Sequence, residues 1–225
     1  MAPDFGEACG WQTMPKRIEV IQELIAARGP RVDMLEVGAW TGHGTLYWRA
    51  AIARLPEKGS ITCVDPWRPY HSDFDREVNP VCKEMHEALS SGRAYELFLS
   101  NTAAFPDVGV PIYHHRGTLE EVAPNLGEFD IVFVDGSHYY ADVLRDLRFV
   151  RSLVRPGGLI VGDDLEIQMD ECEESWIRAH PKIDCWMYHP AGRTIHPGVT
   201  AAVWDAFGRV ESKEGVWWRE GNANG

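Results

Sequence analysis

Residues 129–165 read FDIVFVDGSHYYADVLRDLRFVRSLVRPGGLIVGDDL, and this stretch determines the expected fold. Residues 130–134 are a short apolar run, rich in β-branched side chains, that stops at an Asp-Gly turn, which is typical of a buried strand. Residues 139–154 repeat apolar side chains at intervals of three and four, which predicts a helix. The Pro-Gly-Gly run at 156–158 is expected to end that helix, and residues 159–161 supply a second buried strand.

Acidic side chains follow both strands of this unit. Two strands joined through a helix run parallel, so their carboxyl ends meet at one edge of the sheet, where ligands bind in open α/β folds. Asp135 ends the first strand, and Asp163 and Asp164 end the second. Three converging carboxylates repel one another unless a cation bridges them, and oxygen ligands suit Mg²⁺, with Ca²⁺ or Mn²⁺ as alternatives. His138, on the turn after Asp135, is a candidate base.

These acids also have a purely structural interpretation. Asp135 would then open a tight turn, and Asp163 or Asp164 would cap the next helix. Neighbouring strand residues point to opposite faces, so Asp163 and Asp164 can share a metal only if the chain leaves strand geometry there. The presence of three acids and a histidine at paired strand ends favours a site over the structural interpretation.

Length and composition predict one α/β domain over residues 1–225. The net charge of −12 and the lack of a basic run argue against a nucleic-acid partner. The first ten residues lack the basic start and apolar core of a secretory signal, and no apolar run reaches membrane-spanning length. We therefore expect a soluble, cytoplasmic protein without a membrane partner. Five scattered cysteines without a C-x-x-C pair favour free thiols over disulfides or zinc, and a homo-oligomer is left open.

A glycine turn follows the strand expected at residues 32–37. The turn reads G-A-W-T-G at 38–42 and leads into a helix at 44–55, so its backbone amides can approach a ligand closely. A simple tight connection is the alternative. The turn lacks the G-x-G-x-x-G spacing of dinucleotide-binding folds. Glu36, near the end of the strand, would repel a pyrophosphate but attract a ligand amine, which points away from NAD.

Another acid ends the strand expected at residues 61–64. Asp65 in that position suits hydrogen bonding to a ribose diol, and an ordinary strand-end aspartate is the alternative. Trp67, two residues later, is a candidate for stacking on an adenine or for a place in the core or in a lid. Thr118 follows the strand expected at residues 110–115, on the turn that leads to a short helix.

The remaining segments complete the predicted organisation. Thr13 is expected to cap the first helix. Residues 66–105 are long and polar for a connection, so we expect either a substrate-covering lid or an extra helical layer. Residues 166–196, with mixed polarity and several aromatic side chains, are a candidate second lid. A helix at residues 197–207 and a β-hairpin at residues 210–218 follow.

Three stretches carry a resemblance to a known family: L-E-V-G-A-W-T-G at 35–42, F-D-I-V-F-V-D-G-S-H at 129–138 and G-G-L-I-V-G-D-D at 157–164. The chain resembles class I S-adenosylmethionine-dependent methyltransferases. Within them it is most similar to the metal-dependent small-molecule group that includes macrolide-sugar O-methyltransferases and cephalosporin hydroxylase-like proteins. The resemblance covers residues 32–218. It implies a Rossmann-like, doubly wound, mostly parallel sheet with a C-terminal antiparallel β-hairpin.

The resemblance also assigns site residues. It implies that Glu36, Gly38 and Gly42 line the methionine end of the cofactor and that Asp65 holds the ribose. Asp135, Asp163 and Asp164 would bind Mg²⁺, and His138 would be the base. The complete set of expected cofactor contacts is Glu36, Gly38, Ala39, Thr41, Gly42, Asp65, Trp67, Thr118 and Asp135. Trp40 stands where many methyltransferases have glycine, and Asp163 replaces a longer glutamate of some sugar-modifying relatives.

The expected function is Mg²⁺-dependent transfer of a methyl group from S-adenosylmethionine to a hydroxyl of a small polar acceptor, such as a sugar or a natural product. Two rival hypotheses remain at this stage. One keeps the metal but not the methyl donor, which gives a hydrolase or hydroxylase-like enzyme. The other is a catalytically silent cofactor-binding protein.

Overall fold

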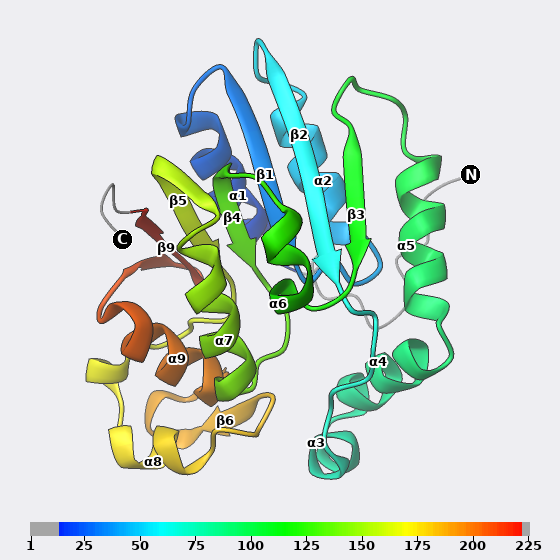
Figure 1. Cartoon of the computed structure of the whole chain (residues 1–225). Coiled ribbons are helices and arrows are strands. Elements are labelled where there is room, and N and C mark those ends of the chain that lie inside the picture. The colour runs from blue at the N-terminus through cyan, green and yellow to red at the C-terminus, as the bar shows by residue number, and fades with distance from the viewer. Residues whose placement is uncertain (1–13, 222–225) are drawn as a thin grey trace.

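The computed structural model describes residues 14–221, which contain a seven-stranded sheet with helices on both faces (Figure 1). Its strands are β1 (Arg31–Val37), β2 (Lys58–Asp65), β3 (Ile112–Arg116), β4 (Phe129–Val134), β5 (Val154–Gly162), β8 (Glu211–Lys213) and β9 (Val216–Glu220). Their order is β3-β2-β1-β4-β5-β9-β8. All pairs from β3 to β5 are parallel, and β9 pairs antiparallel with both β5 and β8. The predicted fold class is confirmed.

The helices that pack against the sheet divide between its two faces (Figure 1). One face carries α1 (Pro15–Ala27), α2 (His43–Ile52) and α5 (Arg93–Ala104), and the other carries α6 (Leu119–Val122), α7 (Tyr140–Val150) and α9 (Pro197–Phe207). Alternate residues of one strand serve the two cores: Met34 packs in the cluster of α1 and α2, and Leu35 packs in that of α7 and α9. Thr13, the expected cap of α1, lies outside the described residues.

The helix expected at residues 139–154 is shorter in the structure, because α7 ends at Val150. The Pro-Gly-Gly run at 156–158 does not end it and lies instead within β5. Val154 pairs with Phe129, and the register then shifts so that Leu159 pairs with Ile131. The run therefore forms an irregularity in the strand. The apolar side chains after α7 mimicked a helical stripe because they enter the core at the start of β5.

Residues 166–196 and the part of residues 66–105 before α5 lie beyond the carboxyl ends of the central strands (Figure 1). Residues 66–105 form α3 (Asp73–Val78), α4 (Pro80–Ser90) and α5, of which α5 packs against α2 as a helical layer. Residues 166–196 form α8 (Glu174–Ala179) and a small antiparallel sheet of β6 (Trp186–Tyr188) and β7 (Arg193–Ile195). Short 3-10 turns occur at Ala123–Asn125, Met169–Glu171 and His189–Ala191. No described helix is both long and apolar enough to cross a membrane.

Candidate functional site

Gly38 sets the spacing of the strand ends at the carboxyl edge of the sheet. Its amide donates to the carbonyl of Val64 at 2.9 Å, and the amide of Asp135 donates to the carbonyl of Val37 at 2.8 Å. A Cβ on Gly38 would lie 1.9 Å from the carbonyl oxygen of Asp135, and the φ of Gly38 is +89°. Only glycine fits this position, because both the close approach and the left-handed backbone exclude other residues.

A cavity of about 240 Å³ opens at this edge, between β1, β2, β4 and the loops that follow them. It is lined by four of the predicted site residues, namely Gly38, Asp65, Thr118 and Asp135. It is also lined by Trp40 and by residues that the sequence did not single out, among them Arg68, Tyr70, Ser137, Asp142, Arg145 and Asp146. A largely apolar cleft with a few convergent polar groups at strand ends is the usual form of a small-molecule site.

Asp65 is held in place by backbone donors. Its two carboxylate oxygens accept from the amide of Trp40 at 3.0 Å and from the amide of Trp67 at 2.6 Å. Burial raises the pKa of Asp65 to about 6, although these amide hydrogen bonds act in the opposite direction. The amide of Ala39 is a third donor to this carboxylate, which has about four acceptor sites, so Asp65 can still accept a hydrogen bond from a ligand diol.

Glu36 faces the core and does not line the cavity. Its carboxyl group accepts from the hydroxyl of Thr45, from the indole nitrogen of Trp48 at 3.0 Å and from the thiol of Cys63 at 3.3 Å. Burial raises the pKa of Glu36 to about 7. The structure thus places Glu36 behind the glycine turn, where it anchors α2 to the strands.

Other predicted contacts are also turned inward. The indole of Trp67 packs against Tyr95 and Phe98, with ring centroids 4.7 and 4.9 Å away, and its nitrogen donates to the carbonyl of Trp40 at 2.7 Å. Trp67 is 1% exposed, which agrees with the core role that the sequence left open. Ala39, Thr41 and Gly42 form the turn into α2 and, like Trp67, are not among the residues lining the cavity.

The three acids at the ends of β4 and β5 come together. Carboxylate oxygens of Asp135, Asp163 and Asp164 lie within 4.8 Å of one another. Asp164 has a φ of +64°, so the chain leaves strand geometry at the point where the sequence required it. These acids and His138 line a second cavity of about 10 Å³, which is roughly the room that one water-sized sphere occupies.

Arg17 on α1 balances the charge of these acids, and sequence reasoning missed it. Its guanidinium donates to Asp163 and Asp164 at 2.8 Å each, and to Glu166 at 2.8 Å. Burial lowers the pKa of Arg17, but the neighbouring carboxylates outweigh burial and raise it. The first helix carries an ordinary amphipathic pattern, so no local signal marks Arg17 as part of the site.

His138 lies between two carboxylates. Its Nδ1 is 2.9 Å from Asp184 Oδ1, and its Nε2 is 3.0 Å from Asp164 Oδ2. Burial alone lowers the pKa of His138, but the charges of Asp184 and Asp164 raise it well above its usual value. The imidazolium form is therefore favoured in this arrangement. His196 packs edge-on against His138 and lies 3.2 Å from the carboxylate of Glu166.

The strand order, the terminal hairpin and the cavity at the glycine turn define the fold class of the S-adenosylmethionine-dependent methyltransferases. A family model described as a methyltransferase domain matches residues 35–165, and the chain belongs to this methyltransferase family. The resemblance deduced from the sequence is confirmed at this level. No curated protein matches the chain in a sequence comparison.

Solved structures share the fold at low sequence identity. An O-methyltransferase family protein from Burkholderia thailandensis is 14% identical, with a TM-score of 0.49, and the match covers 95% of this chain and 57% of that one. The N-methyltransferase NodS from Bradyrhizobium japonicum WM9 is 13% identical, with a TM-score of 0.50 and coverage of 92% and 96%. The chain thus spans little more than half of the Burkholderia protein and nearly all of NodS.

Arg17→Gln should lower the free energy of unfolding at pH 8 by about 3 to 5 kcal/mol, because it leaves buried carboxylates without their cation. The measurement is urea unfolding followed by tryptophan fluorescence. Lys16→Gln is the matched control, since the Lys16 side chain is 72% exposed and pairs only with a half-exposed Glu214. Its expected effect is within about 0.5 kcal/mol. Equal effects of the two substitutions would show that Arg17 does not balance the acids.

Asp146→Asn should stabilise the protein more at high pH than at low pH. Burial raises the pKa of Asp146 to about 7, whereas an aspartate in the unfolded chain has a pKa of about 3.9. At a pH between these two pKa values, the Asp146 carboxyl has lost its proton in the unfolded chain but keeps it in the folded protein. The free energy of unfolding of the wild type therefore falls as the pH rises to about 7. The advantage of the variant should therefore grow by up to about 3 kcal/mol between pH 4.5 and 8.5.

Urea unfolding at both pH values measures this difference. Asp107→Asn serves as the control, because the Asp107 side chain is 88% exposed. A pH-independent effect of Asp146→Asn would mean that Asp146 ionises normally in the folded protein.

Proposed function

We propose that the protein transfers the methyl group of S-adenosylmethionine to a hydroxyl of a small polar acceptor, such as a sugar or a natural product, with a divalent cation, Mg²⁺ being expected. The observation that carries this proposal is the sharing of Asp135, Gly136 and Ser137 by the two cavities. A ligand in the larger cavity would end beside the acidic cluster. Methyl transfer to an ionisable oxygen requires that the methyl donor and the charged groups around the acceptor oxygen lie next to each other.

The larger cavity suits the cofactor. Asp65 would accept from the ribose hydroxyls, and the glycine turn with Gly38 lets the backbone come close to the rest of the molecule. Thr118 and Asp146 line the same cavity and would supply polar groups for the adenine of the cofactor. Asp146 can donate a hydrogen bond when its carboxyl is protonated, which its raised pKa of about 7 favours near neutral pH.

The acidic cluster fits a hard cation. All its donors are carboxylate oxygens, and the small cavity that they line is of the size of one ion or water. Asp135, Asp163 and Asp164 would hold the ion. When bound, a divalent cation supplies positive charge that lowers the pKa of an acceptor hydroxyl and of the nearby His138.

The neutral ring of His138, released from Asp164 at Nε2 when that acid holds the cation, would accept the proton of the hydroxyl there. Asp184 contacts Nδ1 at 2.9 Å, so it fixes the ring orientation and stabilises the imidazolium that forms. The acceptor would lie under the two lid segments. Residues 66–105 contribute Arg68 and Tyr70 to the larger cavity, and residues 166–196 contribute Asp184 to His138. The cytoplasmic location, the lack of nucleic-acid and membrane partners and a homo-oligomer stay predictions.

Calorimetric titration of S-adenosylhomocysteine into EDTA-treated protein, with and without Mg²⁺, tests the cofactor assignment. We expect one saturable site, weakened about tenfold to a hundredfold by Asp65→Asn because hydrogen bonds to a charged acceptor are lost. Asp73→Asn, whose side chain is 96% exposed on α3, should bind like the wild type. NAD should not bind. Absence of S-adenosylhomocysteine binding under both conditions would refute the proposal and favour the metal-dependent alternative without a methyl donor.

His138→Gln should lower kcat on an identified hydroxylated acceptor by about 10² to 10⁴, because a general base contributes that much, and should leave S-adenosylhomocysteine affinity unchanged. Methyl transfer is measured by mass spectrometry of the product. His189→Gln changes an exposed histidine of the same lid region and is the control. A variant at position 138 that retains the wild-type kcat would show that another group takes the proton.

A further inference from the structure

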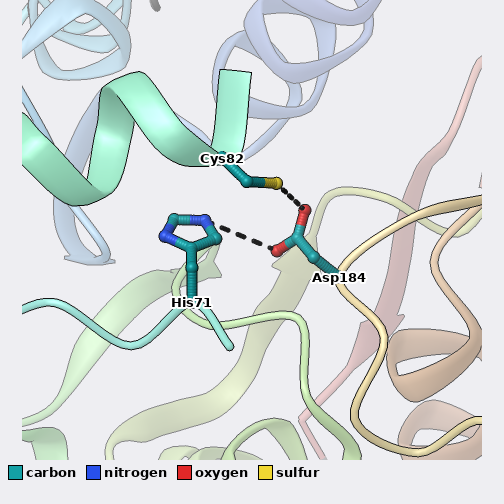
Figure 2. A group of neighbouring side chains, drawn as sticks. All are labelled: His71, Cys82 and Asp184. Carbon is teal, nitrogen blue, oxygen red and sulfur yellow. Dashed lines mark hydrogen bonds and ion pairs between the residues drawn. The ribbon is translucent and has the colours of Figure 1, made fainter. Parts of the chain in front are cut away.

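A second polar cluster lies outside the cofactor cavity and the acidic cluster. It consists of His71, on the stretch before α3, Cys82 on α4, and Asp184 on the loop before β6. Figure 2 shows the three side chains pointing toward one another. Two of them come from the first lid segment and one from the second, more than a hundred residues further along the chain. No sequence motif marks this group, because its members are neither adjacent nor regularly spaced.

The distances within this cluster match a tetrahedral metal site. His71 Nε2 lies 3.8 Å from Asp184 Oδ1, and Cys82 Sγ lies 3.4 Å from Asp184 Oδ2. The ligand atoms of all three residues lie within 4.8 Å of one another. Zinc bonds of about 2.0 to 2.3 Å in a tetrahedron separate the ligand atoms by roughly 3.3 to 3.8 Å. Small side-chain adjustments would therefore bring all three onto one ion.

An unsatisfied histidine is the independent sign of a ligand. The His71 side chain is fully buried, and neither of its ring nitrogens has a hydrogen-bond partner among the described residues. Leaving a buried polar atom unpaired costs about 1 to 3 kcal/mol, so native proteins rarely do so without a reason. A metal bond to Nε2 would supply the missing interaction at the nitrogen that faces Asp184.

We propose that His71, Cys82 and Asp184 bind a transition-metal dication, with Zn²⁺ as the expected ion, and that this ion clips the two lid segments together. Imidazole, thiolate and carboxylate are all zinc ligands, and thiolate distinguishes this site from the oxygen-only acidic cluster. Three protein ligands leave the fourth position to a small ligand such as water.

A catalytic role for Cys82 fits the geometry less well. Its thiol donates to Asp184 rather than to His71, so no imidazole is placed to take its proton. Cys82 is 2% exposed and His71 is 4% exposed, which keeps substrates away from both. The burial of both side chains favours a role for the ion in holding the two segments together over a role in catalysis.

The proposed metal site would also be connected to the proposed methyl-transfer site. Asp184 Oδ1 faces both His71 and Nδ1 of His138, so one carboxylate belongs to both groups. A metal on Asp184 would fix the carboxylate that orients the candidate base. The metal site itself does not depend on the proposed function, because its test records metal binding and not methyl transfer.

Cobalt substitution in the full-length protein tests this proposal. Reduced, EDTA-treated protein is titrated with Co²⁺, and the near-ultraviolet charge-transfer band of a cobalt–thiolate bond is recorded, followed by displacement with Zn²⁺. We expect a band that saturates at one equivalent. It should disappear in Cys82→Ser, and His71→Ala should weaken Co²⁺ binding at least about tenfold to a hundredfold. Asp163→Asn, in the acidic cluster, should leave the band unchanged.

Two controls keep the result interpretable. Cys172→Ser removes another partly buried free thiol and should retain the band. Circular dichroism in EDTA checks that Cys82→Ser and His71→Ala are folded, and Zn²⁺ should raise the Tm of wild-type protein but not of these variants. A wild-type protein without a thiolate band overturns the proposal. So does a band that survives Cys82→Ser, or one that is lost only in Cys185→Ser, the thiol of the neighbouring Asp184, Cys185 and His196 group.

Discussion

The contact of the Arg17 guanidinium with Asp163, Asp164 and Glu166 is the interaction on which the carboxyl edge of the sheet depends. Buried carboxylates at the ends of neighbouring strands repel one another, and burial further penalises their charged form. Arg17 supplies the compensating charge from a helix that is far away in the sequence. It also ties α1 to the loop after β5, so the first helix and the site form one unit.

Shared residues couple the parts of the site. Asp135, Gly136 and Ser137 line both cavities, and Asp184 faces both His138 and His71. A change of charge in one of these groups therefore alters the electrostatic environment of the neighbouring group. The two candidate lid segments take part in this coupling, because residues 66–105 and 166–196 meet at Asp184, whose amide also donates to Asp75 of α3 at 3.0 Å. Both segments are thus connected to the candidate site by direct contacts.

The sequence was sufficient for the presence of the central strands and for the convergence of the three acids, because strand periodicity and strand-end residues are local signals. It was not sufficient for side-chain direction. Glu36 points into the core toward Trp48, since the next helix packs over it, and Trp67 does the same. The contact of Arg17 with Asp163 and that of Cys82 with Asp184 could not be predicted, because they join segments more than a hundred residues apart. The false helix end at 156–158 arose from an irregularity that only strand pairing reveals.

A single NMR measurement tests most directly whether the methyl donor and the metal occupy the adjoining cavities. S-adenosylmethionine labelled with ¹³C in its methyl group is bound to the protein, and Mn²⁺, which carboxylate sites accept in place of Mg²⁺, is added as a paramagnetic probe. Stronger relaxation enhancement of the methyl signal than of the adenine signals is the predicted result, and the enhancement should be lost in Asp163→Asn. A methyl signal that Mn²⁺ leaves unchanged, or broadening greater at the adenine end, would contradict the proposed arrangement of donor and metal.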